Sequence, residues 1–243
     1  MNALSAFLAP FRGLKLLIRP GLRRYVVAPL AINVLLFAGS GWLAYTQLDR
    51  YLAHMLPQDG WLHYLEWLVW PLAVAAYLLL VFYGFTVVAN LIGAPFNSIL
   101  AARVEEKFTG RPPPESQRGL MAEILPAVTG EVGKLLHFLK WAIPVLILML
   151  IPGVNLIGSA LWLLLGFWFL AVEYIDYPMG NHQVPPRDQR RLLRRHPLQA
   201  WAFGAAANLL MLIPGINLAA MPAAVAGATI WWVEGLSKDE MTL

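Results

Sequence analysis

The 243-residue sequence contains no cysteine. This absence excludes a disulfide framework, a thiolate metal site and a cysteine nucleophile. Charge is also scarce, since 13% of residues are Asp, Glu, Lys or Arg, whereas 59% are hydrophobic and ten are tryptophan. A soluble domain typically carries about 25% charged residues. The composition therefore places the chain among membrane proteins, whose core is the lipid-embedded bundle itself.

Catalytic motifs are missing as well. The sequence has no Walker-type loop, no Gly-x-Gly-x-x-Gly turn after a strand and no Gly-x-Ser-x-Gly elbow, and its five histidines lack metal-ligand spacing. Glu173, Asp176 and His182 are the only local candidates for a lipid-modifying enzyme at the membrane surface. We therefore expect no catalytic residues, no metal and no cofactor.

A short phrase occurs twice, as Ile-Pro-Gly-Val-Asn-Leu from Ile151 and as Ile-Pro-Gly-Ile-Asn-Leu from Ile213. Each copy leaves an apolar arm of roughly 10 to 13 residues before it, where a crossing needs about 20. We therefore predict two re-entrant (hemi-penetrating) helical hairpins, at 141–172 and 197–233. Each could instead be two tightly folded crossings. Because unsatisfied backbone is costly in hydrocarbon, the hairpin tips must be covered by protein or line a wet cavity.

Asn155 and Asn217 occupy the two predicted hairpin tips. They are pore candidates if their amides and carbonyls contact a permeant ion, as broken helices do at transporter sites. Alternatively, they only satisfy the backbone of the turn.

The remaining pattern predicts an all-α integral membrane protein with two long transmembrane helices and amphipathic interfacial helices. At the N-terminus, Phe7, Phe11, Leu14 and Ile18 recur at helical spacing, as in a helix lying at the interface. We expect the whole chain, 1–243, to form one membrane domain. Besides the hairpins, its predicted elements are an interfacial helix at 2–19, transmembrane helices at 25–48 and 67–107, and an amphipathic helix at 115–140.

The distribution of basic residues predicts an orientation. Of the 18 Lys and Arg, only Arg50 falls between the two long spans, which leaves 17 on the other side if both hairpins return to where they entered. The positive-inside rule makes that side cytoplasmic, with both termini there. The arginines within 187–195 are read as a loop meeting anionic lipid, not nucleic acid.

Gly21-Leu22-Arg23-Arg24 lies between the interfacial helix and the first span. If a helix begins here, its first amides and two guanidinium groups favour a tetrahedral oxyanion. The other reading is that Arg23 and Arg24 anchor the helix to anionic lipid.

Four charges, Arg103, Glu105, Glu106 and Lys107, end the long second span. Arg103 and Lys107 could attract anions in a hydrated vestibule that the two glutamates tune, or the group is an ordinary solvated helix end. Further along, Ala220, Ala223, Ala224, Gly227 and Ala228 allow close helix packing, between subunits or within one chain.

Taken together and in order, several segments resemble the CysZ family of bacterial sulfate permeases. The matching segments are Pro20-Gly21-Leu22-Arg23-Arg24, Asn90, Ala94-Pro95-Phe96-Asn97, Thr109-Gly110, Ile151-Pro152-Gly153, Asp176-Tyr177-Pro178, Asn181-His182, Val184-Pro185, Ile213-Pro214 and Asn217-Leu218.

The resemblance implies a channel-like permease that takes up sulfate across the bacterial inner membrane for cysteine biosynthesis, without hydrolysing ATP. It also implies two long spans, hemi-penetrating hairpins and a homo-oligomer. The family's sulfate-binding loop corresponds to Gly21, Leu22, Arg23 and Arg24. The alternative is a membrane-shaping or scaffold protein, whose hairpins wedge one leaflet without solute flux.

Overall fold

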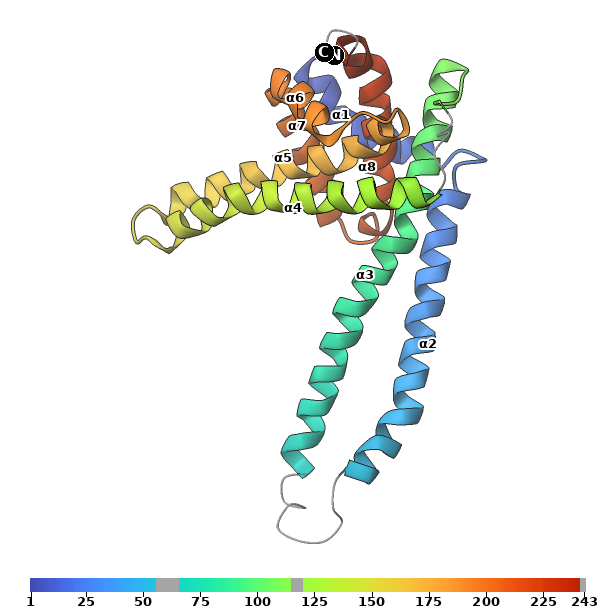
Figure 1. Ribbon diagram of the computed structural model, residues 1–243, viewed down its shortest axis with the longest axis vertical. Coiled ribbons are helices and arrows are strands. Elements are labelled where there is room, and N and C mark those ends of the chain that lie inside the picture. The colour runs from blue at the N-terminus through green and yellow to red at the C-terminus, as the bar shows by residue number, and fades with distance from the viewer. Residues whose placement is uncertain (56–65, 115–119, 241–243) are drawn as a thin grey trace. The chain divides into compact units, whose positions relative to one another are not determined.

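The computed structural model describes residues 1–55, 66–114 and 120–240, and every regular element in these ranges is helical (Figure 1). The chain divides into two compact units, one made of Met1–Val26 and Asn97–Leu243 and the other of Val27–Phe96. The elements in chain order are α1 (Ala3–Leu17), α2 (Arg24–Met55), α3 (Glu66–Thr109), α4 (Leu120–Leu150), α5 (Asn155–Asn181), α6 (Pro186–Arg195), α7 (Pro197–Leu212), α8 (Asn217–Trp231), the π-helical turn η2 (Trp232–Leu236) and α9 (Ser237–Glu240).

Within the described residues, three helical segments are long and apolar enough to cross a membrane. They are Arg24–Trp42, Val132–Leu150 and Asn155–Asn181. An all-helical membrane protein is therefore confirmed as the fold class, whereas the division into spans and re-entrant hairpins stays a prediction.

The unit Val27–Phe96 consists of the greater parts of α2 and α3. These helices have 32 and 44 residues. At a rise of 1.5 Å per residue they measure about 48 and 66 Å, more than the roughly 30 Å of a bilayer's hydrocarbon core. Leu35 and Trp42 on α2 are 72% and 71% exposed, as suits a lipid-facing surface.

Helix α8 is the buried centre of the other unit. Every residue from Pro222 to Trp232 is buried, and α8 packs against α1, α5 and α7. A helix that is apolar all round belongs inside a bundle. The small residues of α8 therefore serve packing within one chain.

Helix α1 packs on α8 through glycine. A methyl group added at Gly13 would lie 2.2 Å from the carbonyl oxygen of Ala223, and one at Gly227 would lie 2.7 Å from the carbonyl oxygen of Ala9. The two backbones thus touch directly, as in membrane helix pairs with small residues at the contact.

The face of α1 that packs on α8 is distinct from the apolar face that the sequence predicts to lie at the membrane interface. The large residues at helical spacing do not form it, since Ile18 is 70% exposed. The buried positions are Ala6, Ala9, Pro10, Gly13, Leu16 and Leu17. Because α1 lies so close to α8, most of this face has space only for small side chains. Small residues therefore form the contact, and the phenylalanines lie outside it.

An ion pair also attaches α1 to the end of the α8 segment. Arg12 Nη1 donates to Glu234 Oε2 at 2.7 Å, and the second guanidinium nitrogen contacts the other carboxylate oxygen. The hydrogen bond from Arg12 lowers the pKa of Glu234. Because the side chains are 43% and 32% exposed, the pair contributes less than about 1 kcal/mol.

The boundary expected at residues 140 and 141 does not exist. Residues 120–150 form one helix, α4, without a break between the predicted amphipathic segment and the first hairpin arm; residues 115–119 lie outside the described part. The expected boundary followed the last charge, Lys140, but glycine and proline end helices and charge does not. The helix instead stops before Pro152-Gly153, with Gly153 at φ +85°.

The two hairpins differ in the length of their arms. Helices α4 and α5 have 31 and 27 residues, so the argument that short arms cannot span does not hold for the first hairpin. Helices α7 and α8 have 16 and 15 residues, about 24 and 23 Å long. The second hairpin therefore retains arms shorter than the hydrocarbon core.

Candidate functional site

The turn between α1 and α2 carries the Gly21–Arg24 segment. Gly21 has φ +93°, a conformation that glycine adopts without steric cost. Leu22 is buried and fastens the turn to its unit, whereas Arg23 and Arg24 are exposed. The segment therefore presents two guanidinium groups on an anchored loop.

The first turn of α2 uses part of its own amides. The amides of Tyr25 and Val26 donate to the carbonyls of Leu22 and Arg23, both at 3.1 Å. Among the described residues, no backbone carbonyl accepts from the amides of Gly21, Arg23 or Arg24. The amides that remain for an anion are thus those of the turn itself.

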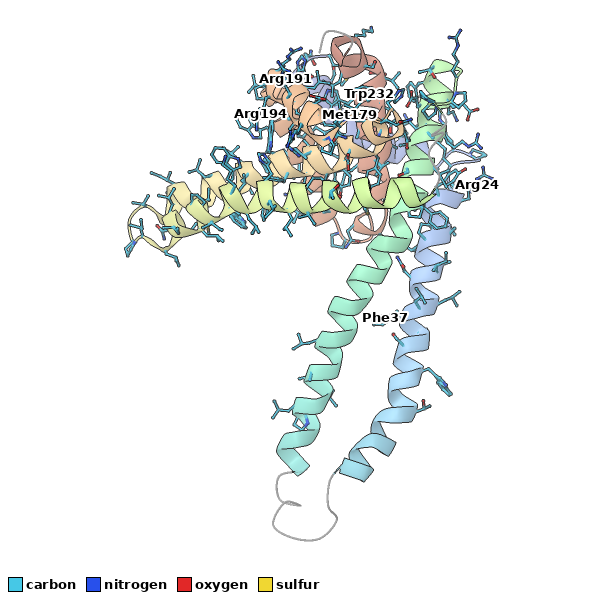
Figure 2. All side chains as sticks on the ribbon, in the orientation of Figure 1. Arg24, Phe37, Met179, Arg191, Arg194 and Trp232 are labelled. Atoms are coloured by element: carbon cyan, nitrogen blue, oxygen red, sulfur yellow. The ribbon has the colours of Figure 1, made fainter. Side chains whose placement is uncertain are left out.

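Tyr25 gathers cations from two helices. Arg24 Nη2 donates to the Tyr25 hydroxyl oxygen at 2.9 Å, and the Arg24 guanidinium lies 4.9 Å from the Tyr25 ring centroid. The side chain of Arg103, near the end of α3, also interacts with Tyr25, and this interaction raises the pKa of Arg103. The sequence analysis treated Arg24 and Arg103 as parts of separate sites, and the structure brings both to one phenol. Figure 2 marks Arg24 at the start of α2.

The other charges at the end of α3 point in different directions. Glu106 accepts from Arg103 Nη1 at 2.7 Å and reduces its net charge, and Lys107 is exposed. Glu105 is buried, with its side chain 8% exposed. The four residues therefore do not form one vestibule cluster, since Arg103 belongs with the turn and Glu105 with the interior.

Glu105 joins the end of α3 to the end of α5. Its Oε1 lies 2.7 Å from His182 Nε2, and the His182 ring lies 5.4 Å from the ring of Trp232. Glu105 Oε2 is buried without a hydrogen-bond partner among the described residues. When a buried carboxylate has a histidine as its side-chain partner, substituting the histidine leaves a buried charge without compensation and destabilises the fold.

Two further contacts strengthen this junction. Asn181 Nδ2 donates to the carbonyl of Ser98 at 2.9 Å. Buried Asn97 hydrogen-bonds through its side chain to Tyr177. The segments around 97, 177 and 181 that carry the family resemblance thus meet in one place and hold the end of α3, with Arg103, beside α5.

The three candidates for a catalytic set have different partners. Lys134 Nζ lies 2.9 Å from Asp176 Oδ2 and 3.4 Å from Glu173 Oε2, whereas His182 pairs with Glu105. The carboxylates thus form a salt-bridge group with Lys134 between α4 and α5.

Asn155 and Asn217 both begin helices after a tip and are exposed. The Asn155 carbonyl accepts from Ser159 Oγ at 2.9 Å, and the Asn217 amide donates to the carbonyl of Ile213 at 3.0 Å. These contacts satisfy local backbone. Their role at a pore stays a prediction, because both lie apart in sequence and element from the Tyr25 group.

Comparisons with known proteins identify relatives of this chain. Residues 9–222 match the model of the family described as sulfate transporter CysZ/etoposide-induced protein 2.4. The sulfate transporter CysZ of Pseudomonas paraeruginosa is 44% identical over 236 residues, which cover 96% of each chain. That of Pectobacterium atrosepticum is 41% identical over 236 residues, covering 96% of this chain and 86% of the relative.

Proposed function

The chain belongs to the sulfate transporter CysZ/etoposide-induced protein 2.4 family, and from this membership and the site's geometry we propose that it carries sulfate across the bacterial inner membrane, supplying cysteine biosynthesis. Moving a doubly charged oxyanion through hydrocarbon has a prohibitive desolvation cost. The protein therefore provides a hydrated, positively biased route. It acts as a permease without enzymatic activity.

The observation that carries the proposal is the convergence of Arg24 and Arg103 on Tyr25, beside exposed Arg23. Guanidinium groups suit tetrahedral oxyanions because their donors are planar and always charged. Three or four charge-assisted hydrogen bonds, less the costs of ordering and desolvation, imply roughly micromolar to millimolar binding. Weak binding suits transport, because the ion must leave.

The route and topology extend this proposal. Helices α2 and α3 cross the bilayer, and both hairpins enter from the cytoplasmic side and return, with Asn155 and Asn217 near the route. The basic helix α6 follows directly after α5, whose end is joined to α4 at Lys134. This arrangement supports a topology in which residues 187–195 lie on the side of the membrane where α4 begins, as the positive-inside rule predicts. Subunits associate as a homo-oligomer.

The function is tested by sulfate flux into proteoliposomes with purified Arg23→Gln/Arg24→Gln protein. We expect flux and sulfate binding to fall by about ten-fold or more, since two charge-assisted contacts are removed. Isothermal titration with sulfate measures the binding, and competition with sulfite, thiosulfate and molybdate gives selectivity.

The matched control is Arg191→Gln/Arg195→Gln, which removes the same charge from α6. Flux in this control should equal that of the unaltered protein. Equal sulfate binding by the Arg23/Arg24 variant and the control would reject the turn as the binding site. Reconstituted protein that passes no sulfate under any gradient would favour a scaffold role instead.

A further inference from the structure

An open groove of about 550 Å³ lies among α4, α5 and α7. Most of its lining is apolar and aromatic, including Phe138, Trp162 and Phe169, and Lys134 and Glu173 also line it. Phe138 contacts both other rings, at centroid distances of 4.8 Å to Phe169 and 6.1 Å to Trp162. The volume falls in the range of ordinary ligand pockets.

One cation and two carboxylates lie together at the groove. Lys134 pairs with Glu173 and with Asp176, and Asp176 also accepts from Gln189 Nε2 at 2.7 Å. Lys134 offsets one of the two negative charges, and the charge of Asp176 also acts on Arg190 of α6.

A group of cations borders the same aromatic wall. The ring of His137 lies 5.7 Å from that of Phe169, and the charges of Lys140, Arg190 and Arg194 act on His137. Two of these cations come from α6 and one from α4. Figure 2 marks Arg194 and its neighbour Arg191 on α6.

Arg190 is the least satisfied member of this group. Its Nη1 is buried and has no hydrogen-bond partner among the described residues. Burial and the neighbouring charges of Arg194 and Arg187 lower its pKa. The charge of Asp176 acts in the opposite direction. A guanidinium with a buried nitrogen that lacks an acceptor is stabilised by an anion.

We propose that this site binds an anionic phospholipid, with the phosphate on Arg190, Arg194 and Lys140 and one acyl chain in the aromatic groove. The two halves of the site meet at His137 and Phe169. A cationic group beside an apolar groove complements an amphiphile of this kind, in which a phosphate is joined to a hydrocarbon chain. The site is separate from the Tyr25 group and does not depend on the sulfate proposal.

The headgroup is tested by native mass spectrometry of the delipidated full-length protein titrated with phosphatidylglycerol or phosphatidylcholine. We expect phosphatidylglycerol to bind roughly ten-fold tighter, and this preference to disappear in Arg190→Gln/Arg194→Gln. Arg191→Gln/Arg195→Gln removes the same charge from α6 and should keep the preference. Equal binding of the two lipids, or equal loss in both variants, would overturn the proposal.

The groove is tested by Gly166→Leu. Gly166 lines the groove, and a Cβ atom added there meets nothing within 4 Å, so a larger side chain can start from this position and occupy the groove. We expect phosphatidylglycerol binding to fall several-fold. If phosphatidylglycerol bound this variant as tightly as the unaltered protein, the acyl chain would not lie in the groove, and this part of the proposal would be wrong. If soluble glycerol phosphate displaced the lipid at equal concentration, the site would be an ion site and the lipid proposal would fail.

Discussion

Tyr25 is the residue on which the candidate sulfate site is centred. Its phenol is buried and holds Arg24 and Arg103, which come from different helices. Sulfate can recruit both guanidinium groups only if they are kept close together before the ion arrives. Tyr25 is therefore a positioning residue.

Substituting Tyr25→Phe tests this role. We expect about a five-fold loss of sulfate affinity, equivalent to about 1 kcal/mol for one lost hydrogen-bonding group, with little change in thermal stability. Titration calorimetry with sulfate measures the effect. Unaltered affinity would mean that the phenol does not organise the arginines.

His182 supports a second prediction, which concerns stability. Its loss in His182→Ala leaves the buried Glu105 without a partner at either oxygen among the described residues. We expect a loss of about 2 to 4 kcal/mol. Glu106→Ala is the control, since it breaks an exposed pair with Arg103 and should cost less than about 1 kcal/mol. Similar melting temperatures for the two variants would contradict a structural role for the Glu105–His182 contact.

Sequence reasoning named the arginines and Glu105 but missed Tyr25 and the pairing of Glu105 with His182. Arg23 and Arg24 stand out because two charges adjoin a glycine at the start of an apolar run. Tyr25 follows them directly, and an aromatic residue there also fits a membrane-interface belt, so nothing local distinguishes it. Glu105 and His182 are 77 residues apart, and no local pattern encodes such a pairing.

At the scale of elements, the contact between α1 and α8 depends on glycine. In Gly13→Ala the new methyl group would lie 2.2 Å from a backbone carbonyl oxygen, which cannot rotate away as a side chain can. We expect a loss of about 1 to 3 kcal/mol. Thermal unfolding in detergent, followed by tryptophan fluorescence, measures it.

Gly133→Ala is the matched control for this substitution. Gly133 also lies in a helix, and a methyl group there meets nothing within 4 Å. This variant should be as stable as the parent or slightly more stable, because alanine favours helix. If Gly13→Ala unfolded at the same temperature as Gly133→Ala, the backbone contact would not be tight.

Element lengths were predicted well where strong breakers mark the ends. Pro20-Gly21 and both Pro-Gly tips lie between helices as expected. The continuous helix through residues 140 and 141 was not predicted. Only the loss of charge after Lys140 suggested a boundary there, and backbone hydrogen bonds continue through such a change. The pairing of α1 with α8 was not predicted, because tight helix packing uses small residues, whereas periodicity highlights large ones.

At the scale of the whole molecule, the open question of topology can be answered by labelling. The natural chain has no cysteine, so single cysteines need no background removal. Arg50→Cys should react with a membrane-impermeant maleimide from the periplasm and Arg187→Cys only from the cytoplasm. Periplasmic labelling at 187 would overturn the orientation and the proposed route.

Asn155→Cys distinguishes the two forms of the first hairpin. If the hairpin re-enters, this tip should not react from the periplasm, and if α4 and α5 cross, it should. Both helices are long enough for either outcome. The second hairpin, with its shorter arms, should not expose Asn217→Cys to the periplasm.

The tip at Ile151–Gly153 is exposed. How far this tip enters the membrane therefore bears on whether the protein must form an oligomer. Its carbonyls tolerate water but not bare lipid, and no part of the described chain covers them. A hairpin that stops midway must therefore meet a neighbouring subunit or a water-filled cavity at its tip, so an isolated protomer surrounded by lipid alone would be unstable. A hairpin that emerges on the far side makes no such demand, and a lone protomer could persist.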